Sequence, residues 1–229
     1  ITHAQQSFSL AQSIGNQKAE METRMLWGFA LTRQGNYAAA QIQLTQALQQ
    51  AQSAGLSKFT SQCLLYLSTN ANLQCDYDAS LGFVQQALQI CREDGDQEQE
   101  MTAICHLGTV LEYSNDLPGS NRALEEYLQL SRQLGSLYHE CYALLNLSNN
   151  ALKQGHYELA LQRGSDALDR AIILQDRYVE LAIQETLGET LLCLGDFLRA
   201  QQKFEQALLS ARSLGARGEE LAQLVHLCH

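Results

Sequence analysis

The chain has 229 residues, and its 25 acidic side chains against 15 basic ones give a formal net charge of −10 at pH 7. This balance argues against nucleic-acid binding, which needs clustered cations, and no long apolar run or leader indicates membrane insertion or secretion. The seven cysteines have no C-x-x-C spacing and are typical of free thiols in a reducing compartment, so we expect a cytoplasmic chain without membrane contact.

A short turn segment returns through the chain at a fixed interval. Gly35-Asn36-Tyr37 is followed by Cys75-Asp76-Tyr77, Asn115-Asp116-Leu117, Gly155-His156-Tyr157 and Gly195-Asp196-Phe197, each 40 residues after the one before. Glycine favours the left-handed backbone that ends a helix, and Asn or Asp can cap the helix that follows. We expect a helix A before each turn and a helix B after it, with the ring that opens helix B packed against helix A. Self-similarity at a fixed period predicts an all-α solenoid of antiparallel helix pairs.

In chain order, the sequence predicts a single solenoid over residues 1–229. A second series of glycines, which includes Gly15, Gly55 and Gly215, marks the return from helix B to the next helix A. Five full repeats are predicted at 16–55, 56–95, 96–135, 136–175 and 176–215, with helix B of a truncated repeat at 1–15 and helix A of another at 216–229. Because cut repeats expose apolar faces, we expect the natural protein to continue in both directions and this chain to self-associate end to end.

Each predicted helix A carries a large residue beside a very small one. The pairs are Trp27-Gly28, Leu67-Ser68, Leu107-Gly108, Leu147-Ser148 and Leu187-Gly188. We expect the small residue to let helix B approach closely, so that a larger side chain there would overpack the core. The residues expected to cap helix A are Asn16, Ser57, Asp96, Ser136 and Asp176.

These residues resemble the tetratricopeptide repeat. Its pattern is matched by Leu107-Gly108 in helix A, and by Ala200, Phe204 and Ala207 in helix B. The repeat is longer than the roughly 34-residue form of that family and closes on glycine instead of proline. In these respects it is similar to the repeats of Pins/LGN scaffolds and MalT-type bacterial regulators. The resemblance implies a right-handed superhelix that recognises a partner or ligand within a signalling assembly.

The sequence shows no constellation that is typical of an enzyme. Cys105 and His106 are the nearest thing to a thiol and base pair, but adjacent helical residues point about 100° apart. Cys228-His229 lacks the spacing of a zinc motif, and the acidic residues between 93 and 100 lack the ligand order of a calcium loop. We therefore expect a non-enzymatic chain without catalytic, cofactor or metal-binding residues.

Partner recognition is expected on the A helices, which line the concave side in the resembling family. Asn side chains can pair with a peptide backbone and aromatic rings can accept apolar anchors, so Tyr66, Tyr113, Asn146 and Asn149 are expected to contribute most. The residues predicted to bind the partner are Met25, Phe29, Arg33, Leu65, Tyr66, Thr69, His106, Thr109, Tyr113, Leu145, Asn146, Asn149, Lys153, Glu185 and Glu189.

Three hypotheses for the function follow from this pattern. The leading one is a protein- or peptide-binding segment of a larger cytosolic signalling or regulatory protein, with the partner segment bound in the concave groove. The alternative is a sensor of a small ligand or peptide that controls an attached effector, such as a MalT-like transcription regulator or a signalling enzyme. The third is a purely structural spacer.

Overall fold

The computed structural model describes residues 2–13 and 15–227, the first four of them by their backbone alone, and all regular structure in these ranges is α-helical. The predicted all-α class is therefore confirmed. The described helices are α1 (Thr2–Ser13), α2 (Gln17–Arg33), α3 (Tyr37–Ser53), α4 (Ser57–Asn72), α5 (Tyr77–Asp94), α6 (Gln97–Tyr113), α7 (Leu117–Gln133), α8 (Leu137–Lys153), α9 (Tyr157–Leu174), α10 (Arg177–Cys193), α11 (Phe197–Leu214) and α12 (Arg217–Leu227).

One residue in every turn has a left-handed backbone. At Cys75 this geometry lets the backbone N–H of Cys75 donate to Asn72 O and that of Asp76 donate to Ala71 O, which satisfies carbonyls at the end of α4. The side chains at Cys75, Asn115 and Gln175 make this conformation more costly than glycine would. The residues with positive φ recur every 20 positions and are Gly15, Gly35, Gly55, Cys75, Gly95, Asn115, Gly135, Gly155, Gln175, Gly195 and Gly215.

The helix caps agree only in part with the sequence-based prediction. Asn36 and Ser136 stand at the N-cap position without a side-chain hydrogen bond. Ser57 was expected to cap α4 but is its first helical residue, because Leu56 takes the N-cap position. Side chains that accept a hydrogen bond from the first turn of the following helix include those of Asn16, Asp76, Asp96, Asp176 and Asp196.

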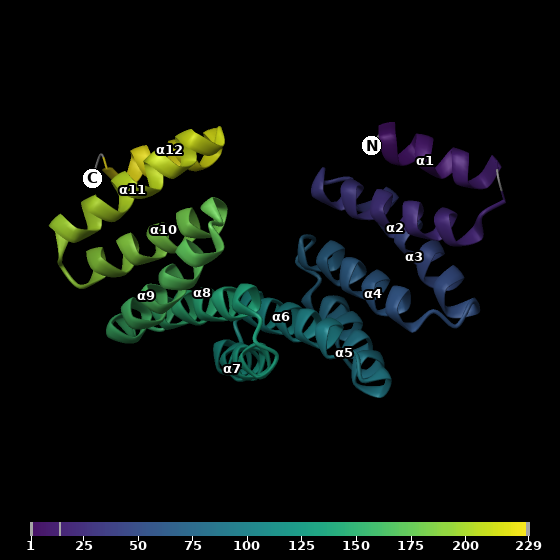
Figure 1. Cartoon of the computed structure of the whole chain (residues 1–229), viewed down its shortest axis with the longest axis horizontal. Coiled ribbons are helices and arrows are strands. Elements are labelled where there is room, and N and C mark those ends of the chain that lie inside the picture. Colours follow the sequence, from purple (N-terminus) through teal and green to yellow (C-terminus); the bar gives the residue numbers. More distant parts are fainter. Residues whose placement is uncertain (1, 14, 228–229) are drawn as a thin grey trace. The chain divides into compact units, whose positions relative to one another are not determined.

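The chain forms two compact units, residues 1–116 and 117–229. Their boundary falls between α6 and α7, inside the predicted repeat 96–135, so the single solenoid over 1–229 stays a prediction. In the first unit α2 packs on α3 and α4 on α5. In the second unit α8 packs on α9 and α10 on α11. Figure 1 shows these pairs as antiparallel hairpins within each unit.

The even-numbered helices, here called A-type, also pack directly against one another. Within the first unit α2 contacts α4 and α4 contacts α6, and within the second unit α8 contacts α10. Of the odd-numbered B-type helices, α3 and α5 contact the A-type helices on both sides of them in the first unit, and α9 and α11 do so in the second. These A-type helices therefore lie side by side within each unit, and the predicted partner residues are all on A-type helices.

Close approach between helices A and B depends on a small residue, as predicted. A Cβ atom added to Gly188 would lie 2.6 Å from Cε1 of Phe204, and one added to Gly28 would lie 2.6 Å from Cγ of Leu44. Where serine takes this position, the Ser148 hydroxyl donates to the Ala160 carbonyl at 2.7 Å across the same contact. The ring that opens helix B does not always pack, however, because Phe197 is 69% exposed.

The described part of the chain bears on two expectations, that the cysteines are free thiols and that no helix crosses a membrane. None of the six cysteines within it forms a disulfide. No described helix combines the length and the apolar character that crossing a lipid bilayer requires.

Candidate functional site

In the first unit, an aromatic pair joins two neighbouring A-type helices. The rings of Phe29 on α2 and Tyr66 on α4 stack with centroids 4.6 Å apart and an angle of 26° between their planes. Both rings are half-buried, and burial raises the pKa of the Tyr66 hydroxyl, so this group stays a neutral hydrogen-bond donor at pH 7. Arg33 follows Phe29 by one helical turn and is exposed. An apolar side chain of a partner could pack on this pair while an acidic group meets Arg33.

The remaining predicted residues of the first unit differ in how accessible they are. Tyr113 is 58% exposed near the end of α6. The hydroxyls of Thr69 and Thr109 each donate at 3.0 Å to the carbonyl four residues earlier, so their polar capacity is partly used inside their own helices. Burial lowers the pKa of His106 to about 4, and the imidazole is neutral at pH 7.

Three of the predicted partner residues are core residues instead. Met25, Leu65 and Leu145 are 5%, 2% and 7% exposed, and Met25 packs in a cluster with Leu44. They share one position of the repeat with Cys105 and Glu185, which are half-buried. Burial at this edge of the strip therefore depends on how the neighbouring helices cover it in each repeat.

In the second unit, the predicted amides lie on α8. The Thr186 hydroxyl on α10 donates to the side-chain oxygen of Asn149 at 2.7 Å and thereby fixes its amide plane. Asn146 is half-buried one turn earlier, and Lys153 is exposed one turn later. Amides held on the surface in this way can donate to and accept from an extended peptide backbone.

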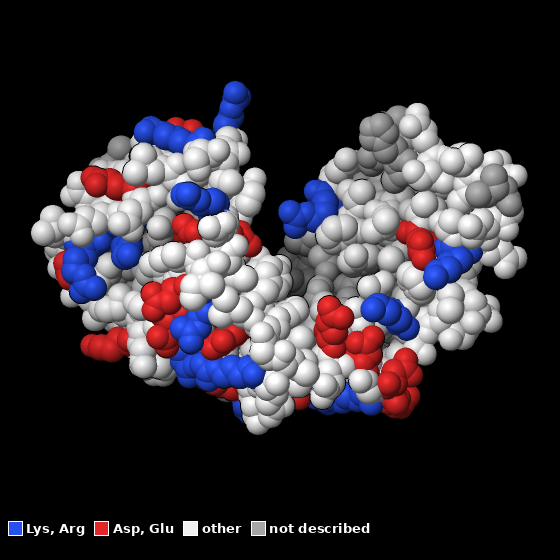
Figure 2. Space-filling view, in the orientation of Figure 1, with Lys and Arg blue, Asp and Glu red and all other residues white. Residues whose placement is uncertain are grey.

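Two acidic residues extend the strip onto α10. Glu185 and Glu189 lie one turn apart, and each places a carboxylate oxygen 3.8 Å from Nε2 of His226 on α12. Burial and the charge of Glu185 raise the pKa of the Glu189 carboxyl, and His226 acts in the opposite direction. On the face that Figure 2 shows, charges of both signs are interspersed in each unit without a broad patch of either.

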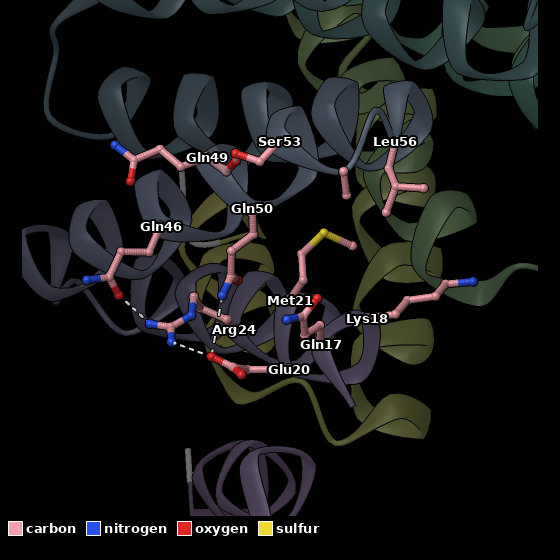
Figure 3. A pocket seen from close by; sticks show the side chains of 11 residues that line it. Gln17, Lys18, Glu20, Met21, Arg24, Gln46, Gln49, Gln50, Ser53 and Leu56 are labelled. Carbon is pink, nitrogen blue, oxygen red and sulfur yellow. Dashed lines mark hydrogen bonds and ion pairs between the residues drawn. The ribbon is translucent and has the colours of Figure 1, made fainter. Parts of the chain in front are cut away.

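A polar cavity between α2 and α3 was not expected from the sequence. It has a volume of about 700 Å³ and opens on the side where α2 begins and α3 ends (Figure 3). Its lining consists mainly of long polar side chains. The lining residues are Gln17, Lys18, Glu20, Met21, Arg24, Gln46, Gln49, Gln50, Ser53, Ala54 and Leu56.

Arg24 is the centre of this cavity wall. Its guanidinium donates to the Glu20 carboxylate at 3.1 Å and also to Gln46, and the same carboxylate accepts from Gln50 at 3.4 Å (Figure 3). The ring of Phe8 on α1 lies 4.4 Å from the Arg24 guanidinium carbon. The Nε atom of Arg24 and the Oε1 atom of Gln50 are buried without a hydrogen-bond partner among the described residues. These two atoms leave hydrogen-bonding capacity unused in the packing of α2 on α3.

One signal in the sequence could have revealed the polar cavity. The positions 40, 80 and 120 residues after Arg24 are Leu64, Ile104 and Leu144, all of them buried. The fifth full repeat has Gln184 at this position, so Arg24 is the one charged residue among the five copies, and it marks a repeat whose interior differs from that of its neighbours.

Several solved structures have a fold similar to that of this chain. No protein-family model and no curated protein matches the sequence. Among solved structures, the chain is similar to BtubC (BKLC) from P. vanneervenii, with 17% identity, a TM-score of 0.79 and coverage of 93% of this chain and 90% of that one. It is also similar to a signal-transduction ATPase (STAND protein) with a tetratricopeptide repeat sensor from Pyrococcus horikoshii, with 14% identity, a TM-score of 0.76 and coverage of 93% and 33%. The chain has the tetratricopeptide-repeat fold.

A third solved structure with a similar TPR-type fold is that of a gene regulator. The Rap conjugation gene regulator of plasmid pLS20, solved in complex with a peptide, has 16% identity, a TM-score of 0.79 and coverage of 95% of this chain and 60% of that one. The present chain thus spans about three fifths of the Rap regulator and about a third of the STAND protein. The TM-scores show a shared TPR-type fold. At identities of 14% to 17% they show nothing about a shared function.

Proposed function

We propose that this chain is a non-catalytic TPR segment of a larger regulatory protein of the cytoplasm and binds a peptide or an extended protein segment on its A-type helices. In each unit, the observation that carries the proposal is a strip of half-exposed aromatic or amide side chains on the A-type helices of that unit. In the first unit the strip offers the Phe29–Tyr66 stack and Tyr113, and in the second it offers Asn146 and Asn149.

The chemistry of the strip suits an extended peptide better than a folded surface. Amide side chains satisfy the backbone N–H and C=O groups that an extended segment presents, and the flat rings accept apolar side chains. The similar Rap regulator, which was solved with a bound peptide, supports this choice of partner class. A folded partner would instead require a larger apolar patch than these interspersed side chains supply.

The first test is the loss of peptide affinity on truncation within the strip. Peptides selected from a displayed library on the purified chain would be labelled, and their affinity measured by fluorescence anisotropy. Tyr113→Ala is expected to weaken the binding of peptides held by the first unit, and Asn149→Ala that of peptides held by the second unit, each by about fivefold or more, or about 1 kcal/mol. Tyr113 is exposed and Asn149 is half-buried, so the fold should tolerate both changes.

Matched controls lie away from the strip. Phe197 is 69% exposed at the start of the B-type helix α11, and Gln202 is exposed on the same helix. Phe197→Ala and Gln202→Ala should leave the peptide affinity unchanged. Equal losses from control and strip variants, or a library that yields no binding peptide, would contradict the proposed site.

A second candidate function is the sensing of a small polar ligand in the cavity between α2 and α3. The polar lining of the cavity favours it, because the Glu20 carboxylate and the Arg24 guanidinium lie together at one wall. A cation and an anion at one wall, surrounded by glutamine amides, suit a zwitterion such as a free amino acid.

This second candidate is tested by a thermal-shift screen with free amino acids. At least one of them should raise the melting temperature, because a ligand that binds only the folded state stabilises it. The rise should shrink in Lys18→Gln, which removes an exposed cation of the cavity lining, and persist in Lys58→Gln, an exposed lysine outside it. A screen without any stabilising amino acid, or a rise that Lys18→Gln leaves intact, would count against the sensor.

A further inference from the structure

Three potential metal ligands converge between α10 and α12 in the second unit. They are Glu185, Glu189 and His226, and the ligand atoms that they offer all lie within 4.8 Å of one another. The two glutamates stand four residues apart, so they share one face of α10, and the imidazole reaches both from the next A-type helix. The side chains of Glu185 and His226 are 32% and 29% exposed, and that of Glu189 is 44% exposed, so the cluster is open to solvent on one side.

The electrostatics of the cluster favour a bound cation. The two carboxylates face each other with a single imidazole beside them, and even a protonated imidazole would offset one of their two negative charges. A divalent ion would offset both. No closer ion pair or hydrogen bond to either carboxylate is made by the described residues than the 3.8 Å approach of His226 Nε2.

The imidazole is held in place by the core. Its ring stacks on Phe204 with centroids 4.6 Å apart and planes only 4° from parallel, and Phe204 is 1% exposed. A ring fixed against a buried side chain keeps its Nε2 atom toward α10, and such preorganisation lowers the conformational cost of binding a metal.

We propose that Glu185, Glu189 and His226 bind one divalent transition-metal ion, with Zn²⁺ as the representative species. One imidazole nitrogen and two carboxylate oxygens suit ions of this class, whereas Mg²⁺ and Ca²⁺ prefer sets made of oxygen alone. Zinc–ligand distances of about 2.0 to 2.2 Å require the carboxylate ends to close slightly on the ion, a movement that side-chain rotation supplies.

Such an ion would have two consequences for the second unit. It would tie α12 to α10, two helices from successive repeats, and so stabilise the packing of α12. Because three protein ligands leave a position open in tetrahedral coordination, a water molecule or a carboxylate of a bound partner could complete the shell. The proposal therefore adds a metal-dependent contact to the strip and does not require that a peptide binds there.

The test uses the full chain after treatment with a chelator. Zn²⁺ titrated calorimetrically should bind at one site per chain and raise the melting temperature. Glu189→Gln and His226→Gln should each weaken Zn²⁺ binding by about tenfold or more and reduce the rise in melting temperature. Glu180→Gln on the same helix and His156→Gln, an exposed histidine, are the matched controls and should bind as the unchanged chain does.

Co²⁺ substitution separates this site from binding by cysteine. The visible spectrum of the Co²⁺-loaded chain should lack a thiolate charge-transfer band, because the proposed ligands are nitrogen and oxygen. A strong thiolate band, or affinity that survives both Glu189→Gln and His226→Gln, would overturn the proposal. So would a loss of binding confined to Cys228→Ser or His229→Gln, two residues that lie outside the described ranges.

Discussion

Replacing Phe204 by alanine is expected to lower the free energy of unfolding of the second unit by about 3 to 5 kcal/mol. The Phe204 side chain is 1% exposed, packs with Leu191 and Ala200, and lies closest to the position that a Cβ atom of Gly188 would take. Removing the ring leaves a cavity between α10 and α11 that the two helices can fill only in part. Urea denaturation followed by circular dichroism measures the loss.

The control for this prediction lies on the same helix. Phe197 is 69% exposed at the start of α11, so Phe197→Ala removes the same atoms from a side chain with few neighbours. We expect it to change the free energy of unfolding by no more than about 0.5 kcal/mol. Comparable losses for the two variants would mean that the register of α11 on α10 is wrong.

The second large effect is expected from Gly188→Leu. A Cβ atom at Gly188 would already lie 2.6 Å from the Phe204 ring, and the further atoms of leucine would push α11 away from α10. Overpacking of this kind costs about 1 to 3 kcal/mol. Gly82→Leu on α5 is the matched control, because a Cβ atom there meets nothing within 4 Å. A thermal melt that leaves Gly188→Leu unchanged would refute the close packing.

The same two positions allow a test of their coupling. If leucine at position 188 clashes with the Phe204 ring, the double variant Gly188→Leu/Phe204→Ala removes the clash and partly fills the cavity. The double variant should therefore lose less free energy of unfolding than the two single losses added together, since contacting residues are not additive. If the losses in free energy of unfolding were additive, leucine at position 188 would not clash with the Phe204 ring.

The candidate site was predictable from the sequence only as a stripe. The 40-residue register correctly places Phe29, Tyr66 and Tyr113 on A-type helices, because helical periodicity determines which residues share a face. It does not determine how wide the exposed part of that face is. Met25, Leu65 and Leu145 are buried because neighbouring helices cover their edge of the stripe, and that coverage depends on how the helices cross.

The metal-ligand cluster and the polar cavity depend on contacts between segments that are far apart in the chain. His226 lies 37 residues after Glu189, and no short motif joins them, so spacing alone gave no reason to group them. Gln50 and Glu20 are likewise brought together only by the packing of α3 on α2. Sequence reasoning that looks for local ligand patterns does not detect sites of this kind.

The amino-acid sequence by itself determined the helical class, the position of every described turn and the need for small residues such as Gly28 and Gly188 between paired helices. These are local or periodic properties, since a left-handed residue every 20 positions and an apolar face can be recognised without knowing what they contact. Only the tertiary structure decided which polar side chains meet, such as Arg24 with Glu20 and His226 with Glu185. Those contacts depend on the crossing angle and the separation of neighbouring helices. Many weak packing contacts together determine both quantities, and no single residue encodes them.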